Sequence, residues 1–516
     1  APARRWLRAA SALAALLVHR AAGEEACASG EPALLSGESV NPRVRDAEYA
    51  VRGPILLRAL EMEADLAAGR GNYPFKQIVK CNIGNPQALG QRPITFSRQV
   101  LSLVLNPALL DDASVVAAFP SDAVARARRY LAAVGSAGAY SESQGVTLVR
   151  EEVAAFIEDR DGVRASKDNI FLTAGASQAV QQLLTILIRS QDDAVLVPIP
   201  QYPLYSSLTT LLGGHMAGYL MGEANGWELD LPELRAALDR ARAAGKSVRA
   251  LVVINPGNPT GSTLSEESML ELIEFCEKEK LVLLADEVYQ TNIYRGDRPF
   301  ISFRRALHTA GILNEDGTMA RPFQLASFHS VSKGVVGECG LRGGYGEYLG
   351  FPRGVRDQIY KLASIGLCSN VPGQLSVGLM VNPPQSGDPS FARYQSERSA
   401  VFDSLRRRAN KLEAALNSVP GVKCNPIEGA MYAFPQIDLP AKFVAESKAA
   451  GEQPDQRYAL RLLESTGLVA VPGSGFGQRE GTYHVRTTFL PPEELMDEVL
   501  ERFRDFHTAF VEEYAN

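Results

Sequence analysis

The sequence predicts an α/β protein with a large, mostly parallel sheet covered by helices on both faces, followed by a smaller α/β domain. Short unbroken apolar segments alternate with amphipathic helical patterns through the middle of the chain, which is typical of parallel strands buried on both faces. The chain has 516 residues and is 46% hydrophobic, which is more than a single core usually organises. A second, smaller core is therefore expected in the C-terminal part.

The predicted elements follow this alternation. Strands are expected at 170–173, 194–198, 250–254, 281–285 and 324–327, with helices at 178–189, 231–244 and 265–279. After Pro383 the pattern changes to a long charged helix at 391–419 and shorter strands near 431–434 and 483–488. A last helix begins at about Pro492 and should place one apolar stripe against a core, formed by Leu495, Val499, Phe503, Phe506 and Phe510.

These patterns divide the chain into a presumed targeting segment at 1–30, an N-terminal arm at 31–99, a large domain at 100–382 and a small domain at 383–516. The first residues are rich in arginine and alanine and contain no acid before Glu24, a pattern that resembles a mitochondrial transit peptide. The mitochondrial matrix is therefore the expected location. The alternatives are a secretory signal built on the apolar segment 9–18, the cytoplasm or another organelle.

Composition excludes several classes of protein. The net charge of −6 is mild and spread along the chain, so no nucleic-acid partner is expected. No apolar run approaches the roughly 20 residues that cross a bilayer, so no membrane span is expected. The six cysteines are far apart, without a CxxC pair or histidines at ligand spacing, which predicts reduced thiols and no metal site.

Two loops that follow predicted strands carry groups suited to a phosphorylated ligand. The loop 173–177 precedes a helix and consists of small residues, so the backbone N–H groups of Ala176 and Ser177 can approach a phosphate. Taken alone, this loop is better explained as an ordinary strand-to-helix turn with a serine cap. The loop 255–261 contains two prolines and two glycines, which fix a rigid turn and hold Asn258 in place as a polar handle.

Two further loops carry charge. Asp286 ends a buried strand, where a carboxylate is costly unless it faces a cation, either a protonated ring nitrogen or a structural salt-bridge partner. Lys333 lies among small residues after the next strand and is suited to attack carbonyl groups. Arg342 follows in a glycine-rich setting that suits a phosphate. A lone lysine is usually a surface residue, but four compatible loops in order favour a cofactor site.

With these motifs, the chain from about Leu34 to Tyr514 resembles the fold-type I aminotransferases that use pyridoxal 5′-phosphate (PLP), and among them the alanine aminotransferase group. The most specific stretches are 48–54, 198–205, the Asn258 loop, 284–290, 333–345, 428–434 and 471–478. The resemblance implies transfer of an amino group from L-alanine to 2-oxoglutarate, giving pyruvate and L-glutamate, by a ping-pong route through pyridoxamine phosphate. A glutamate or alanine:glyoxylate aminotransferase and a PLP lyase on the same fold are the alternatives.

The resemblance also implies the roles of individual residues. Lys333 would be the Schiff-base lysine that moves the substrate proton, and Asp286 would keep the pyridine nitrogen protonated. Asn258 and Tyr289 would bond the phenolic oxygen of the cofactor, and Tyr202 would stack on its ring. The phosphate would be held by Ser330, Arg342 and the backbone of Ala176 and Ser177.

Three other residues gain roles only through the resemblance. Arg486 would bind the substrate α-carboxylate, and Gly84 would close over the substrate beside Asn258. Tyr140 would reach the phosphate of a neighbouring subunit, which implies a homodimer with shared active sites. The sequence departs from the family pattern at Val335, Val336 and Leu341, and it offers no second arginine for the distal carboxylate of glutamate.

Overall fold

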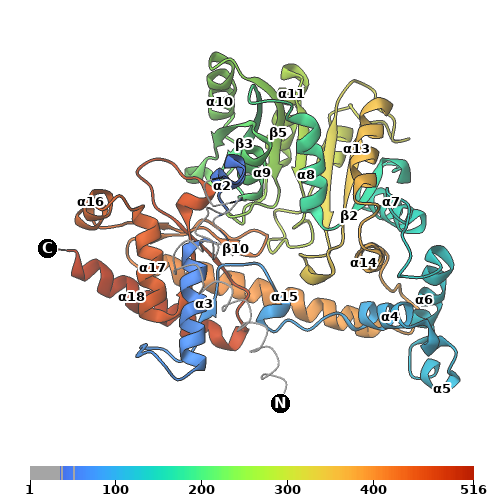
Figure 1. The fold of residues 1–516 in the computed structure, drawn as a ribbon, viewed down its shortest axis with the longest axis horizontal. Helices are drawn as coiled ribbons and strands as arrows, with labels where there is room; N and C mark the ends of the chain where they lie inside the picture. Colours follow the sequence, from blue (N-terminus) through green and yellow to red (C-terminus); the bar gives the residue numbers. More distant parts are fainter. Residues whose placement is uncertain (1–34, 36–38, 50, 52, 516) are drawn as a thin grey trace, which may run out of the picture.

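The computed structural model describes residues 35, 39–49, 51 and 53–515, so the targeting segment expected at 1–30 lies outside it. Its centre is a seven-stranded sheet with the strand order β2-β8-β7-β6-β5-β3-β4 (Figure 1). Neighbouring strands are parallel except at β8, which runs antiparallel to both β2 and β7. The strands are β2 Ile170–Thr173, β3 Asp193–Ile199, β4 His215–Leu220, β5 Ser247–Ile254, β6 Val282–Asp286, β7 Leu325–Ser330 and β8 Gly344–Leu349.

All five predicted strands are confirmed, and β4 and β8 were missed for physical reasons. β4 lies at the edge of the sheet with an exposed first residue, so its apolar pattern is weak. β8 contains two glycines and Glu347, which resemble a loop in the sequence. Glu347 is tolerated inside the sheet because its side chain pairs with the buried Arg304.

Alternate side chains of the strands pack on opposite layers of helices. One face, including Val252 and Leu284, packs against α8 Ala176–Leu187, α9 Leu204–Leu212 and α13 Arg353–Ile365. The other face, including Leu251 and Leu283, packs against α10 Leu231–Ala243, α11 Glu266–Glu279 and α12 Phe303–Thr309. The sheet is therefore buried on both faces, which confirms the predicted α/β class.

A third group of helices packs beside the β2 end of the sheet. Its buried side chains include Val100, Tyr130, Val153 and Leu375, which form one core with Ile170 of β2. The helices are α4 Thr95–Leu105, α5 Ala113–Val116, α6 Ser121–Val134, α7 Thr147–Asp161 and α14 Val371–Val381.

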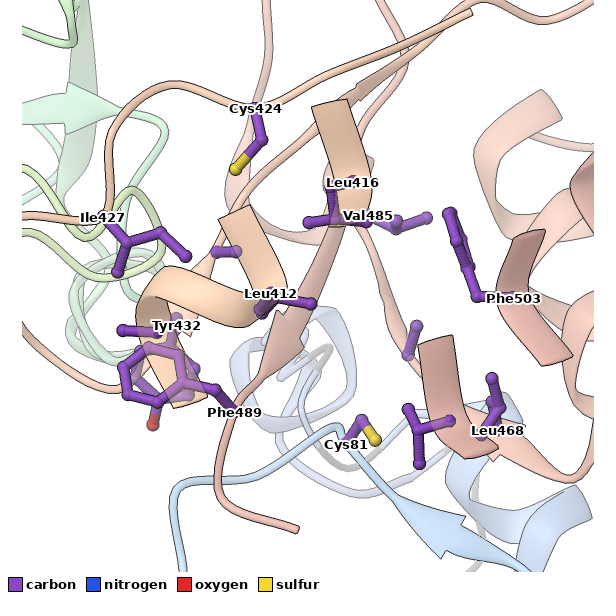
Figure 2. Packing of buried hydrophobic residues seen from close by; sticks show 14 of the residues in the cluster. Cys81, Leu412, Leu416, Cys424, Ile427, Tyr432, Leu468, Val485, Phe489 and Phe503 are labelled. Atoms are coloured by element: carbon purple, nitrogen blue, oxygen red, sulfur yellow. The ribbon is translucent and has the colours of Figure 1, made fainter. Parts of the chain in front are cut away.

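The C-terminal part has its own core. The long helix α15 Phe391–Asn417 extends toward α4 and α6 (Figure 1), while its later turns supply Leu412 and Leu416 to the packing in Figure 2. The remaining elements are α16 Ala441–Ala449, α17 Pro454–Thr466, α18 Met496–Glu513 and short strands β9 Val422–Lys423, β10 Tyr432–Ala433, β11 Gln436–Ile437, β12 Leu468–Val469, β13 Val471–Pro472 and β14 Val485–Thr488. Val499, Phe503 and Phe510 of the predicted stripe are buried, and Phe506 packs partly buried against the same core.

The N-terminal segment packs on this C-terminal part. After α2 Pro42–Asp46, helix α3 Pro54–Ala67 buries Ala59 and Met62 against α17. β1 Val79–Lys80 then pairs with β12. This pairing delivers the loop around Gly84 to the site described below. The division of the chain at residues 31, 100 and 383 stays a prediction.

Other expectations concern what the fold contains. None of the helices in the described ranges is long and apolar enough to cross a membrane. Within the same residues, no three histidine, cysteine or acidic side chains gather as metal ligands. The five cysteines that the structure describes are free thiols, and Cys27 lies outside it.

Candidate active site

A cavity of about 1270 Å³ lies beyond the carboxyl ends of β5, β6 and β7, where open α/β sheets bind their ligands. Ile254, Asp286 and Ser330 end these strands and line the cavity. It brings together the predicted site residues Gly84, Ala176, Ser177, Tyr202, Asn258, Asp286, Tyr289, Ser330, Lys333, Arg342 and Arg486. Tyr140 is not brought into it, and the Tyr140 side chain is 78% exposed.

Asp286 presents a buried carboxylate to the cavity. Its Oδ2 accepts a hydrogen bond of 3.0 Å from the Tyr205 hydroxyl, whereas its buried Oδ1 has no hydrogen-bond partner in the described part of the chain. Burial raises the pKa of Asp286 to about 6, although the Tyr205 hydroxyl, the Val288 N–H and Lys333 act in the opposite direction. A buried acceptor without a donor is costly, so Oδ1 is suited to a protonated ligand atom.

Arg486 is a second buried charge at the cavity. Its guanidinium donates to the side-chain oxygen of Asn258 at 3.1 Å and to the backbone carbonyl of Asn82. Its Nε is buried without a partner, and no carboxylate of the described residues forms an ion pair with it. The ring centroids of Tyr432 and Phe476 lie 4.3 and 4.6 Å from its Cζ. A buried cation without a counter-ion is suited to bind an anion.

Lys333 lies in the loop that follows β7. Its Nζ donates to the backbone carbonyl of Gly84 at 3.1 Å and lies 5.5 Å from the ring centroid of Tyr289. A Cβ at position 84 would lie 2.3 Å from the Tyr432 hydroxyl and 3.0 Å from Nζ of Lys333. Only glycine therefore lets the N-terminal loop approach this lysine so closely.

A cradle for a small anion lies at the start of α8. No side chain caps this helix, so the N–H groups of Ala176 and Ser177 lack partners within it. Gly175 has a φ of +81°, and a Cβ there would lie 2.4 Å from the Arg342 guanidinium. Ser330 lines the same cavity, and its hydroxyl lies 3.0 Å from the Ser332 hydroxyl and 3.1 Å from the Gly343 carbonyl. Two N–H groups, a guanidinium and a hydroxyl are the donors that a phosphate requires.

Tyrosines close the remaining wall. The hydroxyl groups of Tyr202 and Tyr49 lie 2.6 Å apart, and burial raises the pKa of Tyr202 well above its ordinary value. The Tyr289 hydroxyl donates to the Tyr432 hydroxyl at 3.3 Å. These phenols offer flat faces and hydroxyl groups to an aromatic ligand.

Sequence reasoning missed Tyr49, Tyr205 and Tyr432. Each lies inside one of the specific stretches, 48–54, 198–205 and 428–434, so the motif marked the right segment without giving the residue a role. Their contacts depend on side chains that are distant in the sequence, such as the bond from Tyr205 to Asp286. A tyrosine inside such a motif is the signal that could have found them.

The fold matches solved aminotransferases. The structure of an aminotransferase from Escherichia coli superposes with a TM-score of 0.70 at 24% identity and covers 93% of this chain and 99% of that chain. The architecture is therefore that of fold-type I aminotransferases.

The sequence places the chain within a family. Residues 108–503 match the family of class I and II aminotransferases, and the chain belongs to this family, whose members depend on PLP. Alanine aminotransferase 2 of Panicum miliaceum is 50% identical over 93% of this chain and 99% of its own length. Glutamate–glyoxylate aminotransferase 2 of Arabidopsis thaliana is also 50% identical, over 93% and 98%. Probable mitochondrial alanine aminotransferase of Dictyostelium discoideum is 50% identical over 92% and 89%.

Proposed function

We propose that this chain is a PLP-dependent aminotransferase that converts L-alanine and 2-oxoglutarate to pyruvate and L-glutamate. One observation carries the proposal: the carboxylate of Asp286, the ammonium of Lys333 and the guanidinium of Arg486 converge on one cavity. Asp286 keeps an oxygen without a donor there, and Arg486 lacks a carboxylate partner among the described residues. A cofactor with a protonated ring nitrogen and a substrate with a carboxylate supply the missing partners.

The cavity fits the proposed cofactor at three points. Oδ1 of Asp286 is the free acceptor that a pyridinium N–H needs. The start of α8, with Arg342 and Ser330, offers donors to the phosphate. Lys333 offers an amine to the aldehyde, and Tyr202 offers a ring beside it.

When bound, PLP supplies an electron-withdrawing ring that stabilises negative charge on the substrate α-carbon. The residues of this chain bind the substrate, move its proton and exclude water. Arg486 and Asn258 bind the α-carboxylate, and because Arg486 is fixed by two rings it also orients the substrate. Lys333 would take the α-proton and deliver it to the cofactor carbon that is bonded to the amino nitrogen. The Tyr289 hydroxyl, which donates to Tyr432 here, would donate instead to an oxygen on the cofactor when the cofactor is bound. The lack of a side chain at Gly84 allows these groups to enclose the substrate and exclude water.

The test is direct. The purified chain is supplied with PLP, L-alanine and 2-oxoglutarate, and pyruvate is followed over time. Pyruvate and glutamate in equal amounts are expected, and no pyruvate with PLP demonstrably bound would refute the proposal. Release of ammonia without glutamate would instead identify a PLP lyase on the same scaffold.

A second acceptor has specific support. The relative named glutamate–glyoxylate aminotransferase is as similar to this chain as the alanine aminotransferases are. Profiling the amino acceptors 2-oxoglutarate and glyoxylate at equal concentration separates the two activities. We expect 2-oxoglutarate to give the highest kcat/KM with alanine as donor.

We also propose a homodimer with shared active sites. Tyr140, Ile365 and Leu367 are exposed by 78, 76 and 51%. The loop that carries Tyr140 meets the end of α13, where the Ser143 hydroxyl donates to the carbonyl of Leu367 at 2.7 Å. A second copy of the chain is the proposed occupant of this apolar surface. Light scattering gives the oligomeric state, and hybrids of K333A and Y140F protomers test sharing, because only one of the two hybrid sites then keeps both residues.

The proposed location is the mitochondrial matrix. It is supported by the arginine-rich composition of residues 1–23 and by a relative from Dictyostelium discoideum that is named mitochondrial. Import of the chain into isolated mitochondria, with loss of a leader peptide, is the expected result. A chain that stays accessible to added protease would contradict it.

A further inference from the structure

Tyr432 reaches the cavity from the C-terminal core. It lies on β10 and pairs with Thr488 of β14, two residues after Arg486. Its ring is buried in the core of Figure 2, while its hydroxyl faces the cavity. A Cβ built on Gly84 would touch both this hydroxyl and Nζ of Lys333. The phenol oxygen and the lysine nitrogen therefore share one small space.

The groups around the Tyr432 hydroxyl favour negative charge on it. The Tyr289 hydroxyl donates to it at 3.3 Å, the Lys333 ammonium lies beside it, and the Arg486 guanidinium lies 4.3 Å from the ring centroid. Tyr202 is a further neutral phenol nearby. Burial opposes ionisation of Tyr432, but Lys333, Arg486 and the Tyr289 hydrogen bond outweigh it, and the pKa of Tyr432 is lowered from its ordinary value. Tyr289 shows the opposite direction, because burial and the neighbouring Tyr432 raise its pKa.

We propose that Tyr432 is the acid–base partner of Lys333, which gives the phenol a role in the reaction that is distinct from packing. In the step that it controls, the proton on Nζ passes to the phenolate oxygen. This leaves a neutral phenol and a neutral amine whose lone pair can accept the α-proton of the substrate. The proton returns to Nζ when the amine has delivered the α-proton, so the exchange is balanced over one half-reaction. The inference rests on the proposed aminotransferase function.

The aromatic sandwich around Arg486 provides a matched pair of variants. Tyr432→Phe keeps the ring against the guanidinium and removes only the hydroxyl, whereas Phe476→Leu removes the opposite ring and leaves the hydroxyl in place. We expect Tyr432→Phe to lower kcat about 10²-fold with KM for alanine near the wild-type value, as loss of a general acid–base group does. Phe476→Leu should raise KM and change kcat little. Equal kcat in wild type and Tyr432→Phe would overturn the inference.

A second readout needs neither cofactor nor turnover. The near-ultraviolet absorbance of tyrosinate is titrated in the full-length chain without PLP. In wild type a fraction of the tyrosinate signal should appear below the pH at which ordinary tyrosines ionise, because Tyr432 ionises first. That early fraction should vanish in Tyr432→Phe and move to higher pH in Lys333→Ala. An early fraction that persists in Tyr432→Phe would overturn the inference.

The two proposals fail separately. Wild-type protein that binds PLP and forms no pyruvate refutes the proposed function, whatever the tyrosinate titration shows. An active wild type whose Tyr432→Phe variant is equally active refutes only the role of the phenol. Thermal unfolding of each variant confirms that it is folded before its kinetic constants are compared.

Discussion

Two fully buried arginines show opposite solutions to the cost of a buried charge. Arg304 lies on α12 and pairs with Glu347 at 3.2 Å and with Asp161 at 3.8 Å. It also donates to the Val163 carbonyl at 2.8 Å. Arg486 lies at the cavity and donates to two neutral oxygens, and its Nε has no partner among the residues that the structure describes. The charge of Arg304 is balanced by carboxylates of the protein itself, whereas the charge of Arg486 is balanced only when a ligand supplies an anion.

The same contrast separates two adjacent carboxylates. Glu287 points away from the cavity, where it accepts a hydrogen bond of 2.7 Å from the Phe303 N–H and lies near Arg160. Asp286 points into the cavity with one oxygen unsatisfied. Asp286 is the last residue of β6 and Glu287 follows it, so these neighbouring acids serve the site and the scaffold respectively. Charges of the scaffold should therefore govern stability, and charges of the cavity should govern activity.

The largest effect is expected at Lys333. Lys333→Ala should abolish the visible absorbance that PLP gives when it is bound to the protein and should lower transamination by at least about 10⁴-fold, because the second lysine that lines the cavity, Lys80, is paired with Glu63 at 2.9 Å. Urea unfolding should remain near wild type, since no scaffold ion pair is lost. The measurements are absorbance after dialysis with PLP and pyruvate formation. A variant with measurable turnover above a small fraction of a per cent would show that another lysine does this work.

The next effect is one of stability. Arg304→Met should lower the free energy of unfolding by about 3–5 kcal/mol, because Glu347 is left as a buried charge without its cation and Asp161 keeps only Arg160. Denaturant titration gives the loss, and the kcat of the fraction that remains folded should be close to wild type. An unchanged free energy of unfolding would show that the ion pairs of Arg304 do not stabilise the fold.

The same substitution at the other buried arginine should act on binding. Arg486→Met should raise KM about 10²-fold for every amino acid and 2-oxo acid alike, since all of them share the α-carboxylate. The free energy of unfolding should not fall as it does for Arg304→Met, because no carboxylate of the described residues depends on Arg486. Steady-state kinetics with alanine, glutamate and 2-oxoglutarate check this. A rise for one substrate only would indicate contact with a side chain instead.

The sequence predicted those site residues whose position follows from a local pattern. The sequence predicted Asn258, Asp286 and Lys333 as site residues because each lies at or soon after the end of an apolar strand, and all three line the cavity. The partners of these groups could not be read in the same way. Tyr205 reaches Asp286 and the Asn82 carbonyl reaches Arg486 only through folding, across separations that no local pattern records.

The packing of the N-terminal arm was also beyond sequence reasoning. Helix α3 of the arm packs on α17, which lies about four hundred residues later in the chain. The missed strand β8 was hidden for a related reason, because Glu347 looks like a loop residue until Arg304 is placed beside it. Hydrophobic periodicity and turn residues indicate local structure, but they do not show which distant segments of the chain pack together.

The smallest expected effect is on the stability of the cofactor-free protein, where removing the charge of Asp286 should stabilise the fold. Burial raises the pKa of Asp286 to about 6, above the ordinary value of 3.8, so without cofactor its favourable contribution to stability is complete only below pH 4 and is lost as the pH rises through 6. Asp286→Asn should therefore make the cofactor-free protein more stable at pH 7.5, by on the order of 2 kcal/mol, and this gain should shrink toward pH 5.

Urea titrations of both proteins at these two pH values check the prediction. With PLP present the order should invert, because only the carboxylate can pair with a protonated ring nitrogen, and the variant should also lose affinity for PLP. A variant that is less stable than wild type at pH 7.5 without PLP would mean that Asp286 is held by the scaffold after all. In that case the unpaired Oδ1 of Asp286 would not be evidence that this carboxylate is reserved for a ligand.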